Sequence, residues 1–229
     1  MISRRFAGVL LAAALALGAG CGTEPDRKPQ PPTLQPANDT PQNAMLRLVA
    51  AYEQKKLAEY RGLFTGDFRF EFSRADPTLV SRWPGGWSAA DESIAARNLF
   101  QGGRNRYGDS LDAAIRIDLT LASTAPAGDQ EGRDTTLYKE LVTPVGLRVI
   151  VPLPPPSTNP LMYYVEADYH RLFLVRGDAA VGLASDQPAD SAHWYVWRWK
   201  DECFSLPGPA MPAEVPSPVT WGTVKGTYR

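Results

Sequence analysis

Three side chains that could hold a metal ion or share a proton alternate along one short segment. Glu166, Asp168 and His170 in EADYH are spaced two residues apart, and a regular β-strand places residues at that spacing on one face. Two carboxylates and an imidazole can bind a divalent cation. A solvent-exposed polar row is the simpler interpretation, so we assign no metal site and no cofactor. The opposite, packing face would carry Tyr163, Val165, Ala167, Tyr169 and Phe173.

Aromatic side chains form the second candidate site. Trp83 and Trp87 flank a PGG turn, and the segment HWYVWRWK alternates so that one strand face would carry Tyr195, Trp197 and Trp199. Such rings can line a pocket for an apolar or carbohydrate-like ligand. The same pattern is typical of core and sheet packing, and the sequence leaves both interpretations open.

Motifs for other chemistry are missing from the sequence. There are two histidines, no Gly-x-Ser-x-Gly turn, no glycine-rich phosphate loop, and no cysteine or histidine pair at zinc spacing. We therefore assign no catalytic residue and favour a binding protein over an enzyme.

Cys21 has the position of a lipid-modified cysteine. Arg4 and Arg5 precede an apolar stretch from Phe6 to Leu17 and the small residues 18–20, which is the layout of a secretory signal peptide. Because it ends on cysteine, the segment 1–20 resembles a bacterial lipoprotein signal, and we expect cleavage before a lipidated Cys21. The alternatives are an ordinary secretory peptide and a transmembrane helix, for which the apolar run is short. A Cys21–Cys203 disulfide is the rival to an unpaired Cys203.

The segment 21–41 is expected to be a tether. It contains six prolines after Cys21 and little apolar periodicity, so it cannot bury enough surface to order itself. Lipid on Cys21 would make the membrane a partner of the chain, in the cell envelope. Gly22 at the second mature position favours the outer membrane, facing the periplasm, over the inner membrane.

Composition suits one folded domain over residues 42–229. The hydrophobic fraction of 44% with six tryptophans can form a core. The 24 basic and 25 acidic side chains give a formal net charge of -1. No basic surface field follows from this balance, so we expect no nucleic-acid partner.

Helices are predicted first and strands afterwards. Thr40 and Pro41 begin a helix through Tyr52, a second helix covers KKLAEYRGLF, and Ser88 with Asp91 caps a third that stops at Gly102. Alternating apolar residues predict strands at 68–72, 115–121, 137–142, 146–151, 163–175, 192–200 and 221–228. This order indicates an α+β fold.

The segment AYEQKKLAEYRGLFTGDFRFEF resembles the opening of the nuclear-transport-factor-2-like superfamily, which includes ketosteroid isomerases and polyketide-cyclase-like proteins. Trp87, Glu92, Leu99 and Phe100 in W-x(4)-E-x(6)-LF, together with HWYVWRWKDE and TWGTVKGTYR, are similar to bacterial lipoproteins of that superfamily. The resemblance implies a curved antiparallel sheet wrapped around about three N-terminal helices, in a cone with an apolar cavity. The catalytic residues of ketosteroid isomerases find no matching positions here.

Three functional hypotheses follow from these observations. The favoured one is a lipid-anchored binding or assembly module, with an apolar small molecule as its ligand. The alternative is an isomerase or cyclase acting on a small apolar substrate in the cone, which requires a buried carboxylate or tyrosine in the cavity. The third is an interaction protein that forms a homodimer through its sheet.

Overall fold

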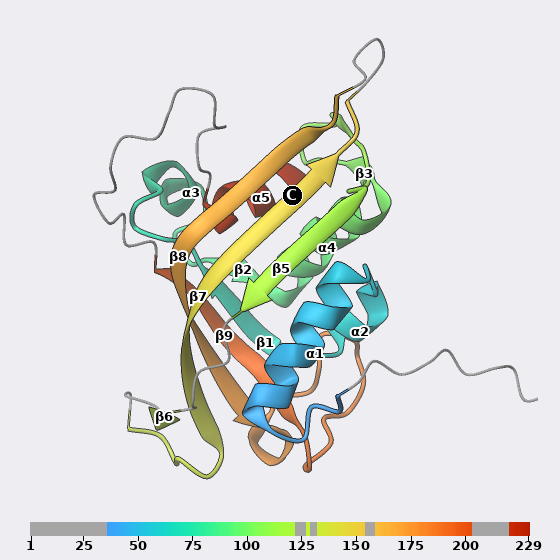
Figure 1. Ribbon diagram of the computed structural model, residues 1–229. Helices are drawn as coiled ribbons and strands as arrows, with labels where there is room; N and C mark the ends of the chain where they lie inside the picture. The colour runs from blue at the N-terminus through green and yellow to red at the C-terminus, as the bar shows by residue number, and fades with distance from the viewer. Residues whose placement is uncertain (1–35, 122–126, 129–131, 154–158, 203–219) are drawn as a thin grey trace, which may run out of the picture. The chain divides into compact units, whose positions relative to one another are not determined.

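A curved sheet forms the framework of the computed structural model, which describes residues 36–121, 127–128, 132–153, 159–202 and 220–229 (Figure 1). The side chains of residues 127, 128 and 166–168 also lie outside this description. The strand order is β2-β1-β9-β8-β7-β5, and β6 pairs with β7. The strands are β1 (Phe64–Glu71), β2 (Trp87–Ser88), β5 (Arg116–Leu121), β6 (Ala127–Gly128), β7 (Tyr138–Val151), β8 (Leu161–Arg176) and β9 (Trp194–Glu202), with a separate pair β3 (Gly103–Arg104) and β4 (Ser110–Leu111).

The curved sheet wraps around the helices, so the α+β prediction is confirmed. Helix α1 contacts β5 and β9, α4 contacts β1, and α5 contacts β8. Predicted caps begin two of the helices: Thr40 accepts the Asn43 N–H, and Ser88 and Asp91 form a reciprocal capping box. The helices are α1 (Pro41–Glu53), α2 (Leu57–Arg61), α3 (Pro77–Arg82), α4 (Ala89–Gln101) and α5 (Trp221–Tyr228), with a 3-10 turn at Gly177–Ala179.

One strand pair corrects the expectation of a wholly antiparallel sheet. Strands β1 and β9 are parallel, with Phe70 opposite Trp199, whereas β9, β8, β7 and β5 pair antiparallel in succession. A parallel pair needs a long connection, and here the connection is the whole stretch from β2 to β8. The sheet is therefore mixed.

Two β-bulges overturn the predicted strand faces. Leu147 pairs with Val165 but Val145 pairs with Asp168, so β8 carries one residue more than β7. The extra residue reverses which side chains of β8 point to each face of the sheet beyond the bulge. His170, which was predicted to face solvent, is therefore fully buried, and Tyr169 is 39% exposed.

The second bulge lies in β9. Arg198 pairs with Phe173 and Val196 with Leu174, which leaves Trp197 as the additional residue. Val196 and Trp199 both belong to the core as a result. The prediction that Trp197 and Trp199 share a strand face with Tyr195 is therefore wrong.

The segment predicted as a last strand, 221–228, is helix α5. Thr220 caps it by accepting the Thr223 N–H at 2.9 Å. A Cβ on Gly222 would lie 2.8 Å from the Phe72 ring, and one on Gly226 would lie 3.1 Å from Leu79. The two glycines thus let the helix lie close against Phe72, which follows β1, and against α3, and their spacing of four fits a helix.

Gly86 is the residue on which the turn between Trp83 and Trp87 depends. Its φ is +71°, and a Cβ there would lie 2.1 Å from the Phe70 carbonyl oxygen, whereas a Cβ on Gly85 would meet open space. We predict that Gly86→Ala lowers the free energy of unfolding by at least about 2 kcal/mol. Gly85→Ala, the matched control, should change it little; equal losses in urea unfolding would contradict this role for Gly86.

Candidate functional site

The five predicted pocket residues do not gather in one place. Trp83 and Trp87 pack edge to face with ring centroids 5.3 Å apart. Phe70 connects this pair to Trp199, since its ring centroid lies 6.4 Å from that of Trp87 and 5.9 Å from that of Trp199.

The other two predicted residues lie elsewhere. The Trp197 indole N–H donates to Asp67 at 3.0 Å, and its ring is covered by the guanidinium groups of Arg133 and Arg198, each 4.3 Å from the centroid. The Tyr195 hydroxyl accepts the Asp190 N–H at 2.9 Å. Burial raises the pKa of Tyr195.

Lys225 is a buried lysine among the aromatic side chains of the core. The prediction of a strand at 221–228 did not indicate this position. The Lys225 ammonium is 4.0 Å from the Phe70 centroid, 4.5 Å from that of Trp199 and 5.3 Å from that of Trp221. Aromatic faces attract cations, more strongly where water is excluded. We call Phe70, Trp199 and Trp221 the aromatic cage.

Glu92 on α4 neutralises this cation. Its Oε2 lies 2.8 Å from the Lys225 ammonium, and its Oε1 accepts the Tyr60 hydroxyl proton at 2.6 Å. Glu92 and Lys225 are 2% and 3% exposed. Burial lowers the pKa of Lys225, an effect that the Glu92 carboxylate opposes, while burial and the same carboxylate raise the pKa of Tyr60 well above its ordinary value.

His170 and Asp201 form a second buried polar group beside the cage. The His170 Nδ1 accepts the Trp199 indole N–H at 2.7 Å, and its Nε2 lies 3.4 Å from an Asp201 carboxylate oxygen. The other Asp201 oxygen accepts the Gly222 N–H at 3.2 Å. His170 thus supports the core, and the Glu166 and Asp168 side chains lie outside the described residues. Within the described part of the chain, no cluster of three His, Cys, Asp or Glu side chains could hold a metal ion.

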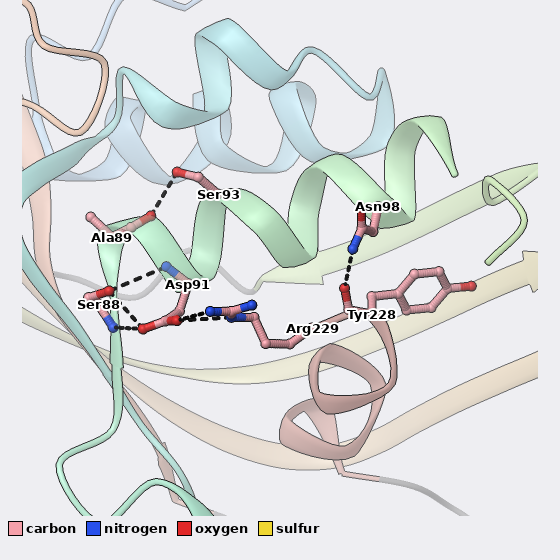
Figure 2. A network of polar contacts seen from close by, with 7 residues as sticks. All are labelled: Ser88, Ala89, Asp91, Ser93, Asn98, Tyr228 and Arg229. Atoms are coloured by element: carbon pink, nitrogen blue, oxygen red, sulfur yellow. Dashed lines mark hydrogen bonds and ion pairs between the residues drawn. The ribbon is translucent and has the colours of Figure 1, made fainter. Parts of the chain in front are cut away.

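An ion pair and a hydrogen bond connect the carboxyl-terminal end of α5 to α4. Figure 2 shows Arg229 directed at Asp91, with guanidinium nitrogens 2.9 and 2.7 Å from the same carboxylate oxygen. The Asn98 amide donates to the Tyr228 carbonyl at 2.8 Å. Burial by itself would raise the pKa of Asp91, but hydrogen bonds from Ser88 and the ion pair with Arg229 together lower it.

The interior arrangement serves to hold α5 in place. Each Glu92 oxygen accepts one hydrogen bond, from Tyr60 or from Lys225. Protonation of Glu92 would therefore break its ion pair with Lys225. Glu92 was visible in the sequence as part of W-x(4)-E-x(6)-LF, but its partner could be found only by recognising 221–228 as a helix.

Several grooves open on the described surface. One of about 330 Å³ is lined by Glu71, Phe72 and Lys200 among others. Another, of about 440 Å³, lies between α2, α4 and the turn 183–186. A third, of about 380 Å³, includes Leu79, Tyr107 and Thr223.

No helix within the described ranges has both the length and the apolar character needed to span a membrane. Cys21 and Cys203 lie outside those ranges.

Comparisons with known proteins give distant structural likenesses. No family model matches this chain, and no curated protein matches it significantly. It is similar to the Kfla4162 protein from Kribbella flavida, with 12% identity, 69% of this chain and 84% of that chain covered, and a TM-score of 0.46.

Two further solved structures are described as nuclear-transport-factor-2-like. One, of unknown function in nutrient uptake from Rhodospirillum rubrum, has 11% identity, covers 70% of this chain and 95% of its own, and has a TM-score of 0.40. The other, from Salmonella enterica serovar Typhimurium, has 10% identity, 74% and 94% coverage, and a TM-score of 0.40. The α+β class of this chain rests on its own helices and strands.

The buried ion pair predicts strong coupling between Glu92 and Lys225. Lys225→Met should cost about 3–5 kcal/mol of unfolding free energy because it leaves a buried carboxylate without its cation. The double variant with Glu92→Gln should cost clearly less than the sum of the single variants in urea unfolding. Arg116→Met, at an exposed ion pair with Asp118, is the control and should cost less than about 1 kcal/mol. Additive effects at Glu92 and Lys225 would rule out the coupling.

The lowered pKa of Asp91 predicts a loss of stability in acid. A carboxyl group whose pKa is lower in the folded state than in the unfolded state stabilises the protein at pH values above its unfolded-state pKa of about 4. This stabilisation is lost as the pH falls through the folded-state pKa. Urea unfolding between pH 6 and pH 3 should show a shallower acid loss for Asp91→Asn than for the wild type. Asp118→Asn is the control, and an unchanged slope for Asp91→Asn would contradict the prediction.

Proposed function

We propose that this chain is a lipid-anchored protein of the cell envelope whose folded unit binds a ligand or partner and does not catalyse a reaction. Cys21, after a charged, apolar and then small-residue segment, supports the anchor. The proline-rich residues 21–41 would serve as the tether, and the folded unit would face the periplasm from the outer membrane. In this proposal the resemblance to nuclear-transport-factor-2-like lipoproteins describes the architecture of the unit.

One observation carries the non-catalytic part of the proposal. The buried groups that could transfer protons are held by neighbours. Glu92 bonds to Tyr60 and Lys225. His170 accepts the Trp199 N–H at Nδ1, and its Nε2, which makes no hydrogen bond within the described structure, lies 3.4 Å from the Asp201 carboxylate. Glu92 is 2% exposed, so a substrate could reach it only by displacing packed neighbours, which include α5 held by the ion pairs of Lys225 and Arg229. Binding on the outer surface of the unit requires no such displacement.

The isomerase or cyclase alternative has one supporting feature. The cage region contains a buried carboxylate, Glu92, and a tyrosine hydroxyl, Tyr60, in direct contact, which are group types that such chemistry uses. Their bonds to each other and the ion pair of Glu92 with Lys225 favour the binding function.

Assembly through the sheet is a further proposal, supported by the exposed apolar side chains of Val142 and Tyr169 on β7 and β8.

The anchor is tested by removing the acylated thiol. Cys21→Ala should transfer the protein from the membrane fraction to the soluble fraction of expressing cells, because two or more acyl chains hold a protein durably and none remains in the variant. Cys203→Ala is the matched control and should stay with the membranes. Retention of Cys21→Ala in the membrane fraction would refute lipid anchoring at this residue.

A further inference from the structure

The groove between α2 and α4 combines an apolar lining with two arginines. Leu57 and Arg61 line it from α2, and Ala90, Ile94 and Arg97 line it from α4. The α4 residues follow one another at three- and four-residue intervals and therefore lie on one side of that helix. The volume of about 440 Å³ is within the range of small-molecule sites.

The turn 183–186 closes the groove on its remaining side and is fixed to the start of β1. The Ala184 N–H donates to the Phe64 carbonyl at 2.9 Å, and the Gly66 N–H donates to the Gly182 carbonyl at 3.1 Å. Leu183 and Ala184 contribute apolar surface here. This side of the groove is thus bounded by backbone that is already hydrogen-bonded.

Arg61 has an unmet hydrogen-bonding requirement in this groove. One terminal nitrogen donates to the Ala184 carbonyl at 2.8 Å, but the buried Nε has no hydrogen-bond partner within the described structure. This Nε is covered by protein and cannot be reached from the groove. The other terminal nitrogen, Nη1, is not covered and has no partner among the described residues, so Arg61 can donate a hydrogen bond from Nη1 to a ligand in the groove that it lines.

Arg97 adds a second positive charge at the same groove. It is exposed, and the described residues include no carboxylate paired with it. Asp186, on the turn, is the acidic residue of the lining. The lining therefore carries two guanidinium groups and one carboxylate, and this net positive charge favours binding of an anion. Guanidinium groups bind carboxylates with charge-assisted, often bidentate hydrogen bonds.

We infer that this groove binds a small amphipathic carboxylate, with its acid group at Arg61 and Arg97 and its alkyl part along Leu57, Ile94 and Leu183. The inference names the ligand class for the proposed binding function and rests on that function. The small side chains of Ala89, Ala90 and Ser93 leave space for the alkyl part beside α4. The site is distinct from the predicted aromatic residues, none of which lines this groove.

Sodium octanoate is the test ligand, titrated into the purified full chain at pH 7 and followed by calorimetry and amide NMR shifts. Octanoate should bind saturably and at least about tenfold more tightly than octan-1-ol, because the alcohol cannot form charge-assisted bonds with the arginines. Octylamine should bind no more tightly than the alcohol. Equal affinity for octanoate and octan-1-ol, or no saturable octanoate binding, would overturn the inference.

Point variants locate the site. Arg97→Gln should weaken octanoate binding about tenfold, and Ala90→Phe, an exposed position on the groove wall, should abolish it by filling the space. Arg148→Gln, at an exposed arginine on β7, is the matched control and should bind as the wild type does. Thermal unfolding of each variant establishes that it is folded, and unchanged binding by Arg97→Gln and Ala90→Phe would overturn the location. These titrations do not depend on Cys21, so their failure is separate from failure of membrane anchoring.

Discussion

The ion pair between Glu92 and Lys225 is the interaction on which the interior depends. An ion pair removed from water is stable only if further contacts replace the lost hydration, and here Tyr60 and the aromatic cage supply them. The pair also ties the last helix to α4. Without it, the fold would have to accommodate an unpaired charge at the centre of its aromatic core.

Helix α5 depends on its contacts with the rest of the fold because its own sequence favours a helix only weakly. Its eight residues include two glycines, two threonines and a valine, which are weak helix formers, and so short a helix is unstable by itself in water. Its contacts with Asp201, Asp91, Glu92 and Asn98 therefore supply its stability. The same glycines that weaken the isolated helix allow it to approach Phe72 and Leu79 closely.

Much of the fold was predictable from local patterns, because caps and apolar spacing act over a few residues. Thr40, Ser88 and Asp91 gave the starts of α1 and α4, and alternation gave β5, β8 and β9. The single strand β7 was predicted as two, 137–142 and 146–151. The bulges at 166–167 and at Trp197 depend on pairing between distant strands, so His170 was assigned to the solvent face and Trp197 to the same face as Trp199. For the same reason Lys225 could not be connected with Glu92, and the groove beside α4 has no motif by which it could be recognised.

The parallel pairing of β1 with β9 has a consequence for how the chain folds. Phe64 pairs with Val196, which follows it by more than half the length of the chain. Contacts so distant in sequence require a large loop to close before they contribute stability, and proteins rich in them fold slowly. During synthesis, β1 is among the first strands to leave the ribosome and among the last to find its neighbour, which leaves an aromatic strand edge open until nearly the whole chain has been made.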